Sequence, residues 1–344
     1  MKFIEFVPSE MTEEEWERYF QSRERLQIES DPNDPIPSRA RRRNYMLNPH
    51  PDYELSWWQV QGKSGDVVGM GGVWWAREGT SIFNEAKDVA YADMIFEQKY
   101  TSEKNQRDFL KRFVSKADEI GKSKLIVETR AESQFTFYAN LGASIVSERT
   151  TNRLYIHDVN MDMIQRWRNE GAKRTPEVRI ERFGSVPDDD LEQFSDLYTE
   201  TWNQAPLEEA SPEMVVTPES RRKMERYFDS QGEIWTTIVS REPDGVISGL
   251  TEIWYQPESW HLIEQGLTGV SEKFRGRGIG KRLKAEMLIF AMNAYPKART
   301  IEAGNADANA PMLSINRRMG FKMHRKMWIL SFNVADLLAR IEKL

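Results

Sequence analysis

The strongest constraint on this chain is that its second half resembles its first. Gly69 and Gly249 take the same place in two similar stretches, DVVGMGGVWWA and DGVISGLTEIWYQ, and lie 180 residues apart. Gly142 and Gly320 end two similar strand-and-helix patterns and lie 178 residues apart. A third pair, FIEF and RIER, opens the two halves. Three blocks in the same order at nearly the same spacing predict a duplicated domain.

The length also fits two domains. The chain has 344 residues, and a domain typically takes about 100 to 200. The polar segment RNEGAKRTP follows an expected helix and is typical of a short linker. We therefore expect one domain over residues 1–168 and a second over 176–344. Hydrophobic residues make up 39% of the chain and aromatic residues 11%, which favours packed cores over disorder.

Composition argues against several classes of protein. The net charge of −6 is unlike that of most nucleic-acid-binding proteins. There are no cysteines, and the 4 histidines are scattered, so we expect no disulfide, no thiol nucleophile and no metal site. The longest apolar run, Val67–Ala76, is too short for a bilayer, and the first residues lack the apolar core of a signal peptide. We expect a cytoplasmic protein without a membrane or nucleic-acid partner, and its oligomeric state stays open.

The second half has the clearer element pattern. Its expected hairpins, followed by strand–helix–strand units, predict the α/β (α+β) class, with a mixed, mostly antiparallel sheet flanked by helices. We expect helices at Gly278–Ala294 and Asn309–Met319. The expected strands are Ile234–Ser240, Val246–Tyr255, His261–Val270, Thr300–Ala303 and a strand pair within Phe321–Phe332.

A glycine-rich turn is the most informative segment. An apolar strand ends at Val270, the turn RGRGIG follows at residues 275–280, and an amphipathic helix begins at once. Glycines let a bulky anion approach the backbone, and the first N–H groups of a helix lack intrahelical partners. This combination predicts a phosphate-binding turn. Neither the P-loop pattern nor the dinucleotide-binding pattern fits these residues.

The turn resembles the diphosphate-binding motif of the GNAT acyl-CoA N-acetyltransferase superfamily, (R/Q)-x-x-G-x-(G/A). The preceding QGLTGV is similar to the family's Q-x-x-T-x-V strand, and GNADANAPMLSINRRMGF is similar to its N-x-x-x-N-x-x-M…N-x-x-x-GF segment. All three occur in family order. The resemblance implies two tandem GNAT folds and a C-terminal copy that binds acetyl-CoA.

The resemblance also implies which residues bind the coenzyme. The diphosphate would lie on the turn, and pantetheine would pair with the strand before it, where the N–H of Val270 or Gly269 would stabilise the oxyanion. Asn305 or Asn309 would contact pantetheine, and Asn309 would also cap the next helix. The full expected set is Thr268, Gly269, Val270, Arg275, Gly276, Arg277, Gly278, Ile279, Gly280, Lys281, Asn305 and Asn309.

The catalytic residues are less well determined. Many family members carry a proton-donating tyrosine where this chain has Asn316, and an amide cannot supply that proton. Glu252, Glu264 and Glu302 lie on expected strands and are candidates for the general base, with Glu302 and Glu252 favoured. The resemblance implies direct acetyl transfer, in a ternary complex, to a primary amine of a small molecule. The alternatives are another acyl group, a thiol, hydroxyl or peptide acceptor, or a non-catalytic acyl-CoA sensor.

The first half is interpreted as a degenerate copy. Where the glycine turn belongs it has EQKYTSEKNQRDF, which contains no glycine. We therefore expect residues 1–168 to bind no coenzyme. This half keeps a tyrosine, Tyr138, at the place of the family's proton donor, and we interpret it as a structural residue.

Overall fold

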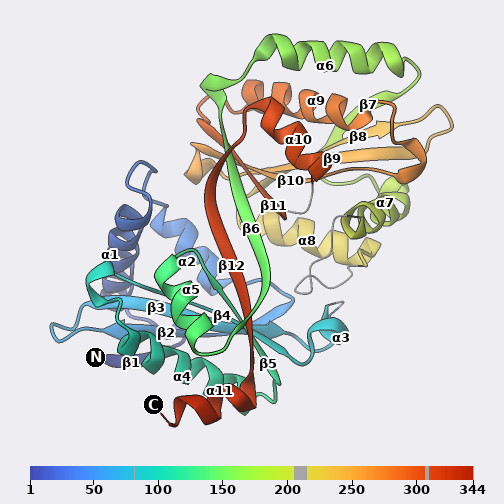
Figure 1. Ribbon diagram of the computed structural model, residues 1–344. Helices are drawn as coiled ribbons and strands as arrows, with labels where there is room; N and C mark the ends of the chain where they lie inside the picture. The colour runs from blue at the N-terminus through green and yellow to red at the C-terminus, as the bar shows by residue number, and fades with distance from the viewer. Residues whose placement is uncertain (81, 205–214, 307–309, 344) are drawn as a thin grey trace. The chain divides into compact units, whose positions relative to one another are not determined.

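The structure is a computed structural model that describes residues 1–80, 82–204, 215–306 and 310–343 (Figure 1). The chain divides into two compact units. Unit 1 comprises Met1–Glu148 and Met327–Leu344, and unit 2 comprises Arg149–Lys326. Each unit contains six neighbouring strands and its own hydrophobic core.

Unit 1 has six strands in the order β1-β2-β3-β4-β5-β12. Of these, β4 and β5 are parallel, and the other neighbours are antiparallel. Its strands are β1 (Lys2–Phe6), β2 (Tyr53–Gln61), β3 (Val67–Ala76), β4 (Val89–Phe96) and β5 (Lys124–Thr129), with the end of β12 (Lys322–Asn333). Its helices are α1 (Glu13–Ser30), α2 (Arg39–Leu47), α3 (Phe83–Ala86), α4 (Glu103–Glu119), α5 (Glu132–Asn140) and α11 (Val334–Ile341).

Unit 2 repeats this order as β7-β8-β9-β10-β11-β6, and here β10 and β11 are the parallel pair. Its strands are β7 (Arg179–Phe183), β8 (Ile234–Arg241), β9 (Ile247–Tyr255), β10 (Leu262–Val270) and β11 (Thr300–Ala306), with the end of β6 (Ser144–Tyr155). Its helices are α6 (Met161–Arg174), α7 (Leu191–Asn203), α8 (Pro218–Ser230), α9 (Ile279–Ala294) and α10 (Ala310–Met319).

The last strand of each half completes the sheet of the other unit. In β6, residues 149–155 pair with β11, although β6 is encoded in the first half. In β12, residues 328–333 pair with β5, and the following helix α11 packs into the core of unit 1. The compact units therefore have other bounds than the expected domains, because two long strands change partners. The division into 1–168 and 176–344 stays a prediction about the repeat.

The expected elements of the second half are present with small changes. The mixed, mostly antiparallel sheet flanked by helices is confirmed. Helix α8 begins after Thr217, whose hydroxyl accepts from the N–H of Ser220 in a capping box. One difference lies at the end, where the expected strand pair within Phe321–Phe332 is a single strand of 12 residues, β12.

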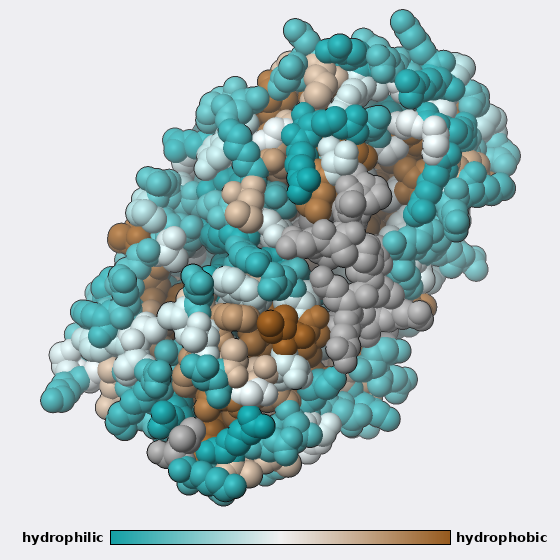
Figure 2. Space-filling model, viewed as in Figure 1, coloured by the Kyte–Doolittle hydropathy of each residue, from teal (hydrophilic) through white to brown (hydrophobic). Residues whose placement is uncertain are grey.

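The surface is mostly hydrophilic. The face seen in Figure 2 is covered largely by polar and charged side chains, with smaller apolar areas between them. Charged residues make up 30% of the chain, so this distribution follows from its composition. Among the described helices, none combines the length and the apolar character needed to cross a membrane.

Candidate functional site

The site in unit 2 begins where two parallel strands separate. Strands β10 and β11 pair from Leu262 with Thr300 to Gln265 with Ala303, and no further. Beyond that point the register of β10 against β9 shifts between Gln265 and Thr268, while β11 continues along β6. Beyond Gln265 and Ala303 the two strands therefore do not pair with each other, and we call the space between them the gap.

The free edge of β10 offers main-chain groups to this gap. The N–H of Ser271 donates to the carbonyl of Ser248 on β9, over 3.0 Å. In an antiparallel pair such bonds alternate, so Gly269 also bonds to β9, whereas Thr268 and Val270 direct their N–H and C=O groups away from it. An extended ligand in the gap can therefore pair with Thr268 and Val270.

A helix start lies at the open end of this gap. Gly276 and Gly278 have φ values of +80° and +86°, a left-handed conformation that favours glycine. Gly278 is the N-cap of α9, and no side chain caps this helix. The first intrahelical bond runs from the N–H of Arg282 to the carbonyl of Gly278, which leaves the N–H groups of Ile279, Gly280 and Lys281 for a ligand.

The glycines keep this helix start accessible. A Cβ on Gly276 would meet no atom within 4 Å, and a Cβ on Gly280 would lie 3.6 Å from a methyl group of Val270. The positive end of the helix dipole and three unpaired N–H groups suit a phosphate. The glycines and the uncapped helix start that a phosphate site needs are therefore in place, and phosphate binding here stays a prediction.

Two expected arginines have different surroundings. The guanidinium of Arg275 donates to the carbonyl of Val270, over 3.3 Å. The guanidinium of Arg277 forms ion pairs with Glu177 at 2.7 Å and Glu242 at 2.9 Å. Two carboxylates therefore already balance the charge of Arg277, which makes it a support of the turn more than a source of free positive charge.

Two other cations flank the helix start. The ammonium of Lys281 lies 6.0 Å from the ring centroid of Trp167. A guanidinium nitrogen of Arg174, at the end of α6, lies 3.6 Å from the place of a Cβ on Gly278. Sequence reasoning missed Arg174 because it belongs to the expected linker; the only signal is its position in a basic run, AKRTP.

Glu252 is fully buried on β9. Its carboxylate accepts from the guanidinium of Arg221 and from the hydroxyl of Thr237, each over 2.8 Å. The other oxygen, Oε2, has no partner among the described residues. Burial raises the pKa of Glu252, while the neighbouring Arg221 and Thr237 act in the opposite direction. A carboxylate with one free oxygen and a raised pKa is suited to accept a proton.

Arg221 holds Glu252 in place, and sequence reasoning missed it. Its guanidinium also pairs with Glu225 at 2.9 Å and lies 3.7 Å from the ring centroid of Trp235. Only 2% of its surface is exposed. The available signal was the i,i+4 spacing of Arg221 and Glu225 on an expected helix.

The other catalytic candidates have surroundings that differ from those of Glu252. Glu302 on β11 is paired with Arg153 of β6, and its Oε1 lies 3.8 Å from the imidazole of His324. Glu264 is exposed on β10. Asn316 is buried in α10, and its carbonyl accepts from the N–H of Phe321 over 3.0 Å. Of the two favoured carboxylates, Glu252 is fully buried, whereas Glu302 is partly exposed.

The two expected pantetheine contacts are not decided by the structure. Asn305 lies on β11, opposite Thr150 of β6. Asn309 lies outside the described residues. Both assignments stay predictions.

Unit 1 has the same gap, and a side chain fills it. Its parallel strands β4 and β5 pair up to Ala92 with Val127 and then separate. The buried side chain of Gln134 on α5 donates to the carbonyl of Met94 on β4, over 3.3 Å, and accepts from the hydroxyl of Thr129 on β5, over 2.5 Å. Gln134 therefore joins the two strands at the place where unit 2 is open.

The helix that follows in unit 1 is capped. The hydroxyl of Ser102 accepts from the N–H of Asn105, and Ser102 is the N-cap of α4. Tyr138 is fully buried in the core of unit 1, with its ring near Phe332. The core position of Tyr138 fits the structural interpretation given to it.

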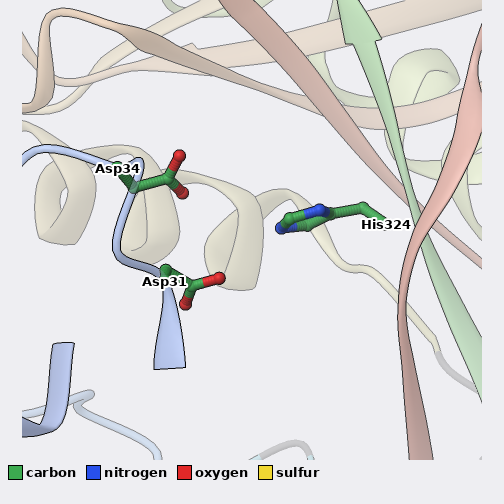
Figure 3. Close-up of side chains that lie close together, drawn as sticks. All are labelled: Asp31, Asp34 and His324. Atoms are coloured by element: carbon green, nitrogen blue, oxygen red, sulfur yellow. The ribbon is translucent and has the colours of Figure 1, made fainter. Parts of the chain in front are cut away.

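The expectation of no metal site stays a prediction. Asp31 and Asp34 lie on the turn after α1, where Figure 3 shows both carboxylates. The third labelled side chain, His324, belongs to unit 2, whereas the two aspartates belong to unit 1. We assign no function to these three residues.

Comparison with known families defines the class of unit 2. A sequence model of the acetyltransferase (GNAT) family matches residues 191–321, from α7 to the end of α10. This segment is therefore a GNAT acetyltransferase domain, a class that transfers acyl groups from acyl-CoA. No curated protein sequence matches the chain.

Solved structures show the fold of the whole chain. A tandem GNAT protein from the clavulanic acid biosynthesis pathway, solved without AcCoA, is similar with a TM-score of 0.77 at 17% identity, over 97% of this chain and 98% of that one. A GCN5-related N-acetyltransferase from Sphaerobacter thermophilus has a TM-score of 0.63 at 15% identity, over 96% of each chain. The chain thus has two tandem GNAT folds.

Proposed function

We propose that unit 2 transfers an acetyl group from acetyl-CoA to a primary amine of a small molecule. The observation that carries this proposal is the uncapped start of α9 after two left-handed glycines, at the open end of the gap between β10 and β11. A diphosphate suits the helix start, and an extended, amide-containing arm suits the gap.

The residues of β10 have separate roles in this proposal. The N–H and C=O groups of Thr268 pair with the amides of pantetheine. The N–H of Val270 donates to the thioester oxygen, where negative charge develops as the amine attacks. Such a donor contributes about 3 kcal/mol to transition-state stabilisation in other enzymes.

Glu252 is the base that we assign. It takes a proton from the attacking amine through its free Oε2, directly or through one water. Glu302, which pairs with Arg153 and is only partly buried, is the alternative base. Glu252 and Glu302 lie on the sheet face opposite α9, because their neighbours Ile253 and Ile301 pack into the core with α9. The amine therefore approaches from the α7–α8 face.

Unit 1 binds no coenzyme in this proposal. Gln134 already uses the carbonyl of Met94, the group that corresponds to Thr268 in unit 2. The capped start of α4 offers one N–H fewer to an anion. One working site per chain is therefore expected.

Calorimetric titration with coenzyme A tests the binding half of this proposal, with one site per chain as the expected result. Release of free coenzyme A across a panel of amines tests the transfer half. Binding without release by any amine would favour a non-catalytic acyl-CoA sensor. Release with thiols, hydroxyls or peptide amines alone would correct the acceptor, and mass spectrometry of the product identifies the acyl group.

A further inference from the structure

Lys284 is a buried lysine for which the proposed function has so far no use. It lies in the second turn of α9, and only 2% of its surface is exposed. Among the described residues, no group accepts a hydrogen bond or forms an ion pair with its ammonium, which lies 5.8 Å from the ring centroid of Phe321. Lysine is rarely buried without a partner, because desolvation of its charge costs free energy.

The position of Lys284 on α9 places it beside the gap. Residues four apart lie on one face of a helix, so Lys284 lies on the same face as Gly280. That face meets β10, since a Cβ on Gly280 would lie 3.6 Å from Val270. Lys284 is one helical turn further from the socket, beside the stretch of β10 that leads back to Gln265, where β10 and β11 separate.

The side chain of Lys284 also reaches toward α10. Phe321, which its ammonium approaches, directly follows α10 and donates its N–H to the carbonyl of Asn316. Asn316 occupies the place where similar enzymes carry a tyrosine that protonates the departing sulfur. The ammonium of Lys284 thus lies near the residue that follows α10, in the buried region on the α9 side of the sheet.

The repeat supplies an internal control for this position. Aligned on its inward residues, α4 of unit 1 has Leu110 where α9 has Lys284, and Leu110 is fully buried. The apolar neighbours correspond as Leu283 to Phe109, Met287 to Phe113, Leu288 to Val114 and Ala291 to Ala117. The fold therefore accepts leucine here, and the copy with the open gap carries the amine.

We propose that Lys284 donates the proton to the sulfur of coenzyme A as the carbon–sulfur bond breaks, a role that rests on the proposed acetyl transfer. The amine nitrogen forms its bond to the acetyl carbon and gives its proton to Glu252. The sulfur leaves with the electron pair of the broken bond and takes a proton from Lys284, which becomes a neutral amine. Water returns a proton to Lys284 and removes one from Glu252.

The acidity of Lys284 suits this step. Burial lowers its pKa from the usual 10.5 to about 7. An ordinary lysine is a weak acid near neutral pH, whereas a group with a pKa near the working pH transfers protons well in both directions. The same ammonium stabilises a thiolate beside it, so bound coenzyme A should ionise at lower pH than free coenzyme A.

The test uses the full chain and measures the ionisation of bound coenzyme A. Ultraviolet absorbance of the thiolate is followed against pH for the wild type, for Lys284→Met, and for Lys297→Met as the matched control. Lys297 is exposed beyond the end of the same helix. In Lys284→Met the midpoint should move up by about one pH unit or more, a tenfold change in acidity. The value of kcat should fall about 100-fold, with little change in KM for acetyl-CoA.

The outcomes separate the two proposals. Equal midpoints in the wild type and Lys284→Met, with coenzyme A bound to both, would overturn the role of Lys284 and leave acetyl transfer standing. No binding of coenzyme A to the wild type would overturn the proposed function itself. If Lys284→Met binds no coenzyme A, Lys284→Leu, which copies unit 1, repeats the measurement; loss of binding in both variants would show that Lys284 shapes the site and is not the proton donor.

Discussion

The strands and helix around the gap are arranged alike in the two units, but a few of their residues differ. In unit 2 the helix start after the gap has Gly276, Gly278 and no capping side chain, whereas in unit 1 it has Ser102, which caps α4. In unit 2 the edge of β10 is free, whereas in unit 1 Gln134 binds the corresponding edge. The parallel strands separate in both.

This difference shows that the same fold leaves the two strands unpaired in both units, and under the proposed function the side chains decide whether a ligand enters. The parallel strands separate after Gln265 with Ala303 in unit 2 and after Ala92 with Val127 in unit 1. Neither separation needs a ligand. Gln134 carries a primary amide, so it satisfies the strand edge with the same kind of group that pantetheine would bring. A protein amide in unit 1 thus replaces a coenzyme amide.

The sharpest test of the comparison places a negatively charged side chain at the start of each helix. Gly280→Glu places a carboxylate where the diphosphate would bind, and Gly280 has no positive φ, so the helix tolerates a side chain. We expect affinity for coenzyme A to fall at least about 1000-fold, or ~4 kcal/mol. Lys104→Glu, in the first turn of α4, should leave affinity unchanged. Equal losses by calorimetry would show that unit 1 also binds the coenzyme.

A second test uses a carboxylate that only unit 2 has. Glu252 on β9 corresponds to Gly72 on β3, so unit 1 lacks the assigned base. In Glu252→Gln we expect kcat to fall about 100-fold, ~2.7 kcal/mol, with acetyl-CoA affinity retained. Because burial raises the pKa of Glu252, the wild-type rate should fall with decreasing pH above the ordinary carboxyl range. A larger loss in Glu302→Gln would move the base to β11.

A third test opens the filled gap. Gln134→Met copies Met312, the corresponding residue of unit 2, and removes the bridge between β4 and β5. The carbonyl of Met94 then loses its partner, so the free energy of unfolding should fall by about 1–2 kcal/mol in a denaturant titration. Coenzyme A should still bind one site per chain, since α4 stays capped. A second binding site would show that Gln134 alone closes unit 1.

A fourth test is a pH dependence of stability. The folded pKa of Lys284 is about 7 and the unfolded value about 10.5, so between them the unfolded state binds more protons. Stability should rise with pH across this window, by at most about 1.4 kcal/mol per pH unit, and be lost as pH falls through it. Lys284→Met should abolish this contribution, whereas Lys297→Met should not. An unchanged slope in Lys284→Met would indicate that Lys284 is hydrated.

Local patterns in the sequence predicted most of the socket. The glycines at 276 and 278, the end of β10 at Val270 and the amphipathic helix after them are consecutive, so turn and periodicity rules apply to them directly. The repeat likewise predicted two copies of one fold. The features of the socket have in common that each depends on neighbours within a few residues.

The remainder depends on partners far apart in the chain. Gln134 bonds to Met94, 40 residues away, and Arg221 pairs with Glu252, 31 residues away. No spacing rule links such residues. The sequence analysis therefore identified Glu252 and Glu302 as candidates, but it did not identify the arginines with which they pair. Lys284 was overlooked because the apolar face of α9 is recognised by its hydrophobic members.

Because β6 pairs with β11 and β12 pairs with β5, the stability of each copy depends on a strand from the other. A fragment beginning at residue 176 would lack residues 149–155 and expose the edge of β11 to other chains. Under the proposed function, a mutation that truncated the copy without coenzyme would therefore damage the copy that binds it. Selection for catalysis in the second copy would then be enough to preserve the first, even without any activity of its own.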